Sequence, residues 1–131
     1  MKGETRLWLK YAEENFRSAE VLLKSHLYNP VLQNVHQSIE KYLKALFIEY
    51  KIGLTKTHNI AWLLQRLKET GIEIAANADT IDMIDSIYLT SRYPIGSVLP
   101  DFHPDEHLCR TLLKAAADIR NEVLQYVNTK G

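Results

Sequence analysis

The sequence predicts an all-α protein, an antiparallel up-and-down helical bundle of about five helices. Three observations favour this fold class. Apolar residues recur at steps of three and four in five segments, no segment alternates as a strand does, and the first connection is so short that it implies antiparallel neighbours. With 131 residues, of which 46% are hydrophobic, the chain fits a single domain covering residues 1–131.

Composition and charge exclude several function classes. The formal net charge is zero, so the chain as a whole is no polyanion binder. Residues 1–72 nevertheless carry 11 basic and 7 acidic side chains, whereas residues 73–131 carry 5 basic and 9 acidic ones. This uneven charge could steer a partner to one face or help two copies pair head to tail. Cys109 is the only cysteine, which excludes an intrachain disulfide and a cysteine zinc cluster. The charged start and the short apolar runs predict a cytoplasmic protein without a membrane segment.

The first two helices are expected over residues 5–25 and 30–52. For the second of these helices, Asn29 is a suitable N-cap and Pro30 a suitable first helical residue. Gly53 fits the left-handed position just past its end. The second helix has an unusually wide apolar side, so we expect it to be the central helix of the bundle. That side consists of Leu32, Val35, Ile39, Tyr42, Leu43, Leu46, Phe47 and Tyr50.

The second helix also has a polar edge. Gln37, Lys41 and Lys44 project together from it, and Glu40 lies at the border with the apolar side. His36 falls inside the apolar arc, one turn before Glu40. Two interpretations stay open: a solvated face supported by i,i+4 pairs, or a working surface.

The third helix is expected to follow a cap at Thr57 and to stop at Gly71. His58 would then lie in its first turn, near free backbone N–H groups, either as a binding residue or in a capping and packing role. The fourth helix is expected from residue 77 or 79 to residue 89. Its row of acids at 79, 82 and 85 is interpreted as a solvated face, and no metal or cofactor is expected.

The loop over residues 91–103 is the one long irregular segment, because two prolines and a glycine interrupt it. Loops of this length in a compact bundle are often functional. This one carries Arg92, Tyr93, Asp101 and His103. The last helix is expected over residues 104–127, with acidic residues in its first turn.

Several segments together resemble the HEPN domain family. They are QSIEKYLKA at residues 37–45, KTHNI at residues 56–60 and SRYP at residues 91–94, in order and with plausible spacing along nearly the whole chain. The resemblance implies a small all-α bundle that forms homodimers. It also implies one component of a prokaryotic two-gene system of the toxin–antitoxin type, in which the HEPN protein cleaves RNA and a minimal nucleotidyltransferase restrains it. Nucleotide binding is an alternative role in this family.

The resemblance also implies candidate site residues, with one departure. RNA-cleaving members have an arginine, four to six residues and then a histidine, whereas ten residues separate Arg92 from His103 here. Arg92 and His103 are the candidate catalytic pair. The hypotheses are a metal-independent ribonuclease, a non-catalytic nucleotide-binding or nucleotidyltransferase-docking module, and a purely structural Arg92 bonded to Glu40 or Asp85. The candidate RNA- or nucleotide-binding residues are Gln37, Glu40, Lys41, Lys44, His58, Arg92 and Tyr93.

Overall fold

The computed structural model describes residues 1–53, 56–92 and 103–130, and within them it shows five helices and no strand. The all-α prediction is confirmed. The helices, listed in chain order, are α1 (Gly3–Lys24), α2 (Tyr28–Glu49), α3 (Ile60–Glu69), α4 (Ala78–Arg92) and α5 (Glu106–Lys130).

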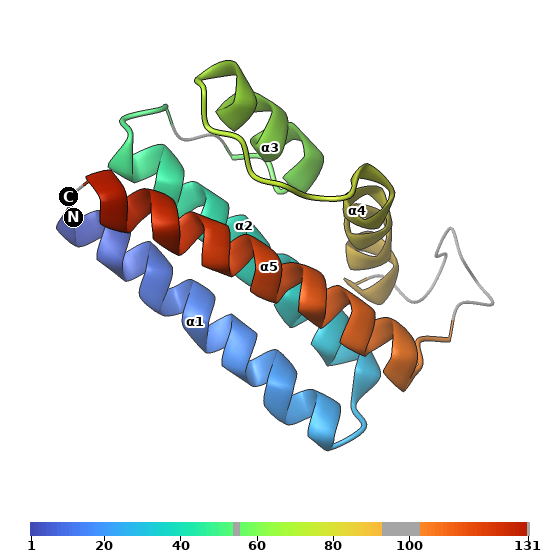
Figure 1. Ribbon diagram of the computed structural model, residues 1–131. Helices are drawn as coiled ribbons and strands as arrows, with labels where there is room; N and C mark the ends of the chain where they lie inside the picture. The colour runs from blue at the N-terminus through green and yellow to red at the C-terminus, as the bar shows by residue number, and fades with distance from the viewer. Residues whose placement is uncertain (54–55, 93–102, 131) are drawn as a thin grey trace.

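The three long helices lie side by side, the shorter α3 and α4 pack against α2, and α4 also contacts α5 (Figure 1). α1 runs antiparallel to α2 and to α5, so the two ends of the chain lie together at one end of the bundle. α2 contacts all four other helices, which confirms it as the central helix. Five of the six buried polar or charged residues in the described part of the chain belong to α2: His36, Ser38, Glu40, Lys44 and Glu49.

The end of α2 differs from the prediction. The helix stops at Glu49, and Lys51, not Gly53, takes the left-handed conformation with φ 58°. The amide of Ile52 donates to the carbonyl of Phe47 at 2.8 Å, which closes the turn and places the Ile52 side chain against the core. Burial of Ile52 therefore decides where the helix ends, against the local preference for glycine.

The helix starts also differ by a few residues. α2 begins at Tyr28, ahead of the expected Asn29 and Pro30. α3 begins at Ile60, and its cap is Asn59, whose side chain accepts the amide of Trp62 at 2.7 Å. Thr57, the expected cap, instead accepts the amide of Asn59 at 3.2 Å. The helix therefore starts two residues later than expected.

We predict that Lys51→Gly raises the free energy of unfolding by about 1 kcal/mol, because a non-glycine residue is strained at positive φ. Gly71, which closes α3 in the same way with φ 91°, shows that the motif suits glycine. The measurement is urea unfolding at pH 7. Lys10→Gly, within the exposed face of α1, is the control and should lower stability by about 1 kcal/mol. Loss of stability in both variants would contradict the assignment of strain to Lys51.

Candidate functional site

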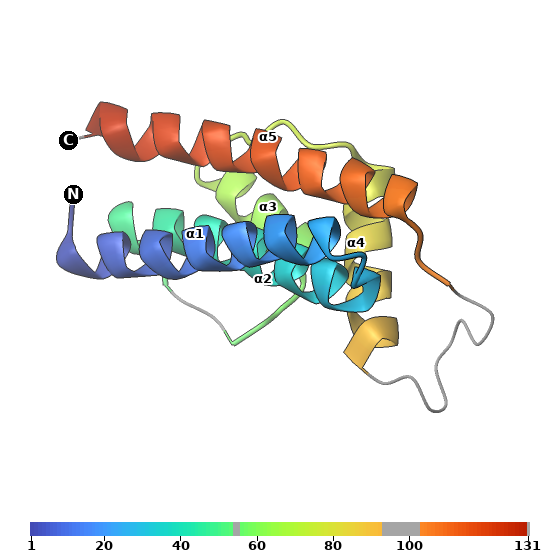
Figure 2. The ribbon, with the colours of Figure 1, turned by 90° about the horizontal axis from the view of Figure 1, so that it is seen from below.

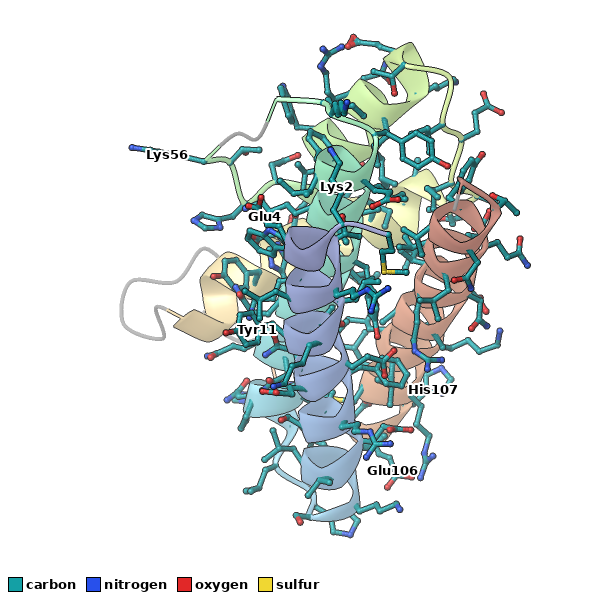
Figure 3. All side chains as sticks on the ribbon, turned by 90° about the vertical axis from the view of Figure 1, so that its left-hand side faces the viewer. Lys2, Glu4, Tyr11, Lys56, Glu106 and His107 are labelled. Carbon is teal, nitrogen blue, oxygen red and sulfur yellow. The ribbon has the colours of Figure 1, made fainter. Side chains whose placement is uncertain are left out.

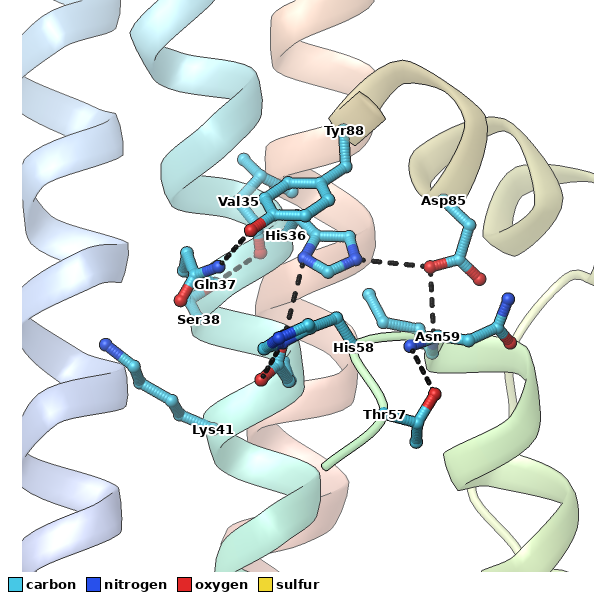
Figure 4. A network of polar contacts seen from close by, with 12 residues as sticks. Val35, His36, Gln37, Ser38, Lys41, Thr57, His58, Asn59, Asp85 and Tyr88 are labelled. Atoms are coloured by element: carbon cyan, nitrogen blue, oxygen red, sulfur yellow. Dashed lines mark hydrogen bonds and ion pairs between the residues drawn. The ribbon is translucent and has the colours of Figure 1, made fainter. Parts of the chain in front are cut away.

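A cluster of charged and imidazole side chains joins α2, α3 and α4 (Figure 4). It consists of His36, Glu40 and Lys44 of α2, His58 just before α3, and Asp85 of α4, and we call it the histidine–carboxylate cluster. The three α2 residues are spaced by four, so they share one face of the helix. On that face His36 contacts α4, and Glu40 contacts the segment that leads into α3.

Glu40 is the centre of the cluster and is 4% exposed. Its Oε2 accepts from Lys44 Nζ at 2.8 Å, and both of its oxygens lie 3.1 Å from His58 Nδ1. Lys44 also lies over the ring of Trp8, 5.9 Å from its centroid. A buried carboxylate is tolerated only when it is paired and hydrogen-bonded, and Glu40 meets both conditions.

His36 lies behind Glu40 and is 1% exposed. Its Nε2 is 3.2 Å from Asp85 Oδ1, and its ring stacks on that of Tyr88 with centroids 3.8 Å apart and an interplanar angle of 13°. The Tyr88 hydroxyl accepts in turn from Gln37 Nε2 at 2.9 Å. Contacts with α4 therefore fix both the plane and the rotation of the imidazole.

Asp85 connects α4 to the start of α3. Its two carboxylate oxygens accept the backbone amides of Ile60 at 3.0 Å and Ala61 at 3.1 Å, in the first turn of α3. A carboxylate there also complements the helix dipole. Burial raises the pKa of Asp85, but the hydrogen bonds from His36 and from the two amides outweigh it and hold the pKa below the ordinary 3.8.

His58 is the member of the cluster that reaches solvent. Its side chain is 60% exposed, whereas the partner carboxylate of Glu40 is 5% exposed. An imidazole has two nitrogens, and Glu40 takes Nδ1, so Nε2 is left to exchange a proton with a ligand. This is the arrangement of a general acid or base oriented by a carboxylate.

The structure brings together three of the predicted site residues, Glu40, Lys44 and His58. His58 precedes α3 by two residues, and its partner is the Glu40 carboxylate. Gln37 adjoins the cluster through the Tyr88 hydroxyl. Lys41 turns away from the cluster and donates to Asn15 Oδ1 of α1 at 2.7 Å (Figure 4).

The predicted catalytic residues lie at the ends of the long loop. Arg92 is the last residue of α4, and its side chain, like Tyr93, lies outside the described residues. Asp101 lies outside them as well. His103 is exposed and precedes α5.

The sequence did not predict the buried contact between His36 and Asp85. Asp85 was assigned to a solvated face, but it is half-buried and bonded to two other elements. Asp79 and Asp82, at the same spacing on α4, are exposed as expected. The signal that pointed inward was His36, an imidazole inside an apolar arc with Glu40 one turn further on.

A groove of about 550 Å³ lies between α3, the start of α4 and α5, and it shares no residue with the cluster. In the described part of the chain, no group of three or more His, Cys, Asp or Glu side chains is arranged to hold a metal ion. None of the described helices is long and apolar enough to cross a membrane.

The fold and the cluster define a small helical-bundle domain, and comparison with known proteins gives its class. The model of the HEPN domain family matches residues 5–126. This chain therefore belongs to the HEPN family.

Solved structures with the same fold include TT1696 from Thermus thermophilus, at 22% identity and a TM-score of 0.66, with 95% of this chain and 98% of that chain covered. They also include ST0689, described as an archaeal HEPN homologue, at 21% identity and a TM-score of 0.65, with 97% and 99% covered. No match was found among curated proteins.

Proposed function

We propose that this HEPN protein is a metal-independent ribonuclease, the RNA-cleaving component of a prokaryotic toxin–antitoxin type system that includes a minimal nucleotidyltransferase. One observation carries the proposal: the imidazole of His58 is 60% exposed while its Nδ1 is held 3.1 Å from a buried carboxylate. A histidine oriented in this way by a carboxylate is suited to act as a general base.

RNA is the substrate class that this chemistry suits, because each phosphodiester has a ribose 2′-hydroxyl beside it. In the proposed reaction His58 Nε2 takes the 2′-hydroxyl proton, and the 2′-oxygen forms a bond to phosphorus. The bond from phosphorus to the 5′-oxygen breaks, and His103 donates a proton to that oxygen. Arg92 stabilises the negative charge that develops on the phosphoryl oxygens. The products are a 2′,3′-cyclic phosphate and a free 5′-hydroxyl.

The positions of two backbone segments support the roles given to Arg92 and His58. Arg92 follows Tyr88 by one helical turn, and Tyr88 stacks on His36. The last turn of α4 and the segment leading into α3 project on the same side of the bundle (Figure 2). Lys56, two residues before His58, is exposed and extends away from the bundle (Figure 3), where it can attract phosphate.

The remaining candidates divide into two groups. Gln37 and Tyr93 stay proposed contacts to RNA or nucleotide. Lys41 and Lys44 are already held by Asn15 and Glu40, so we assign Lys44 to keeping Glu40 in place. A homodimer is part of the proposal, and sedimentation velocity of the full chain would check it.

We predict that His58→Ala lowers the rate of RNA cleavage at least about 100-fold, the usual contribution of a positioned general base. The measurement follows labelled RNA in buffer with chelator and identifies the cyclic phosphate. Arg92→Ala should lower the cleavage rate by a similar factor. His107→Ala is the control: His107 is an exposed histidine of α5, and its loss should leave the cleavage rate unchanged. Equal rates for wild type and His58→Ala would remove His58 from the mechanism.

A second function is favoured by the ten-residue separation of Arg92 and His103, which departs from the spacing of RNA-cleaving members. In this alternative the protein is a non-catalytic module that binds a nucleotide or docks the nucleotidyltransferase. Titration calorimetry with nucleoside triphosphates and with the purified partner tests it. Binding without cleavage would replace the ribonuclease assignment.

A further inference from the structure

One atom in the histidine–carboxylate cluster is not explained by the packing. Among the described residues, the only buried side-chain nitrogen or oxygen without a hydrogen-bond partner is Nδ1 of His36. Its nearest ionic neighbour is Oε1 of Glu40, at 3.8 Å. Buried polar atoms are almost always bonded in native proteins, so this exception needs a reason.

The reason follows from the other nitrogen of the His36 ring, Nε2, which faces Asp85. Asp85 is held ionised by its surroundings and can only accept, so the Nε2 atom of His36 carries a hydrogen. In the neutral ring Nδ1 then presents a lone pair to the Glu40 carboxylate, and the two repel each other. With a second proton, Nδ1 becomes a donor that faces an acceptor. Proton uptake is therefore what gives this atom a partner.

We infer that His36 is a positioning residue for the Glu40–His58 pair, acting through the Oε1 atom of Glu40. Lys44 holds Oε2 at 2.8 Å, and His58 Nδ1 lies 3.1 Å from both oxygens of Glu40. Oε1, which is also 3.8 Å from His36 Nδ1, is therefore the oxygen that both histidines approach. A second proton on His36 draws Oε1 inward, toward α4, and weakens its bond to His58. The titratable groups that the structure shows beside His36 are Glu40 of α2 and Asp85 and Tyr88 of α4. Lys44 and His58 are linked to His36 through Glu40.

This coupling is reciprocal. Two imidazoles that face one carboxylate are coupled through it, so a change at either ring alters the bond that the other ring makes. His36 is sealed from solvent and does not touch a substrate, so it sets the orientation of His58 without entering the reaction. The inference rests on the proposed function only for its effect on RNA cleavage.

The test is a pH titration of the full chain with histidine rings labelled with nitrogen-15, followed by NMR. We expect the His58 ring signals to move in two steps, one of them coinciding with the change of His36 Nδ1 from acceptor to donor. His36→Gln should leave a single step in the His58 curve. His107→Gln, at an exposed position of α5, is the matched control and should keep both steps.

The outcomes are separable. A single-step His58 curve in the wild type, or an unchanged two-step curve in His36→Gln, overturns the inference. If His36→Gln does not fold, the wild-type curves decide, because His36 and His58 signals without a common step overturn it as well. Two linked steps in a chain that cleaves no RNA would support the positioning role and contradict the ribonuclease assignment.

Discussion

Replacing Glu40 by alanine is expected to lower the free energy of unfolding by about 3–5 kcal/mol, the usual cost of removing one partner of a buried ion pair. The variant leaves the Lys44 ammonium, whose side chain is 8% exposed, without a counter-charge. Such a loss is a large part of the roughly 5–15 kcal/mol that a domain has in total. Urea unfolding at pH 7 measures it.

The chain offers a matched control for burial. Lys114 and Asp118 of α5 form another i,i+4 pair, with N–O distances of 2.9 and 3.1 Å, but their side chains are 74% and 55% exposed. Asp118→Ala should therefore cost no more than about 0.5 kcal/mol. Equal losses from the two variants would show that burial does not set the cost of removing the Glu40 carboxylate.

Replacing both partners separates stability from function. The double variant Glu40→Met with Lys44→Met leaves no unpaired charge, so it should recover most of the stability lost in Glu40→Ala. The same double variant should lose RNA cleavage, because His58 no longer has a carboxylate. Failure to recover stability would mean that packing around α2, and not its charge pair, governs the loss.

The sequence predicted the architecture because burial leaves a periodic trace. The apolar side of α2 was wide enough to identify it as the central helix, and α2 does contact the four others. The helix ends were less predictable. Gly53 and Thr57 fit local preferences for a helix end and a helix cap. The end of α2 is instead set by burial of Ile52, and the start of α3 by Asn59, whose side chain accepts the Trp62 amide.

The candidate site was half predictable for the same reason. Glu40, Lys44 and His58 lie in two short segments whose residue types already indicated polar chemistry. Asp85 was proposed only as a possible partner of Arg92. Its contacts with His36 and α3 could not be predicted, because only the crossing of α4 over α2 distinguishes it from Asp82 at the same spacing. One residue beyond Glu40, Lys41 shares the predicted polar edge but bonds to α1, since a helix turns by about 100° per residue.

Asp85→Ala should lower the free energy of unfolding by about 3 kcal/mol at pH 7, because it removes one acceptor from three donors. The donors are the buried Nε2 of His36 and the amides of Ile60 and Ala61. Asp82→Ala, three residues earlier on the exposed face of α4, is the control and should stay within about 0.5 kcal/mol of wild type.

The pH dependence of that loss identifies the charge as its source. The pKa of Asp85 is lower in the folded chain than its ordinary value of 3.8, so near and below this pH the unfolded chain binds more protons at this site than the folded chain does. Its contribution is therefore complete above pH 3.8 and falls as the pH drops through the folded pKa. The gap between wild type and Asp85→Ala should narrow over that acid range in urea unfolding curves. A gap that stays constant would mean that neutral contacts, and not the carboxylate charge, hold α3 and His36 to α4.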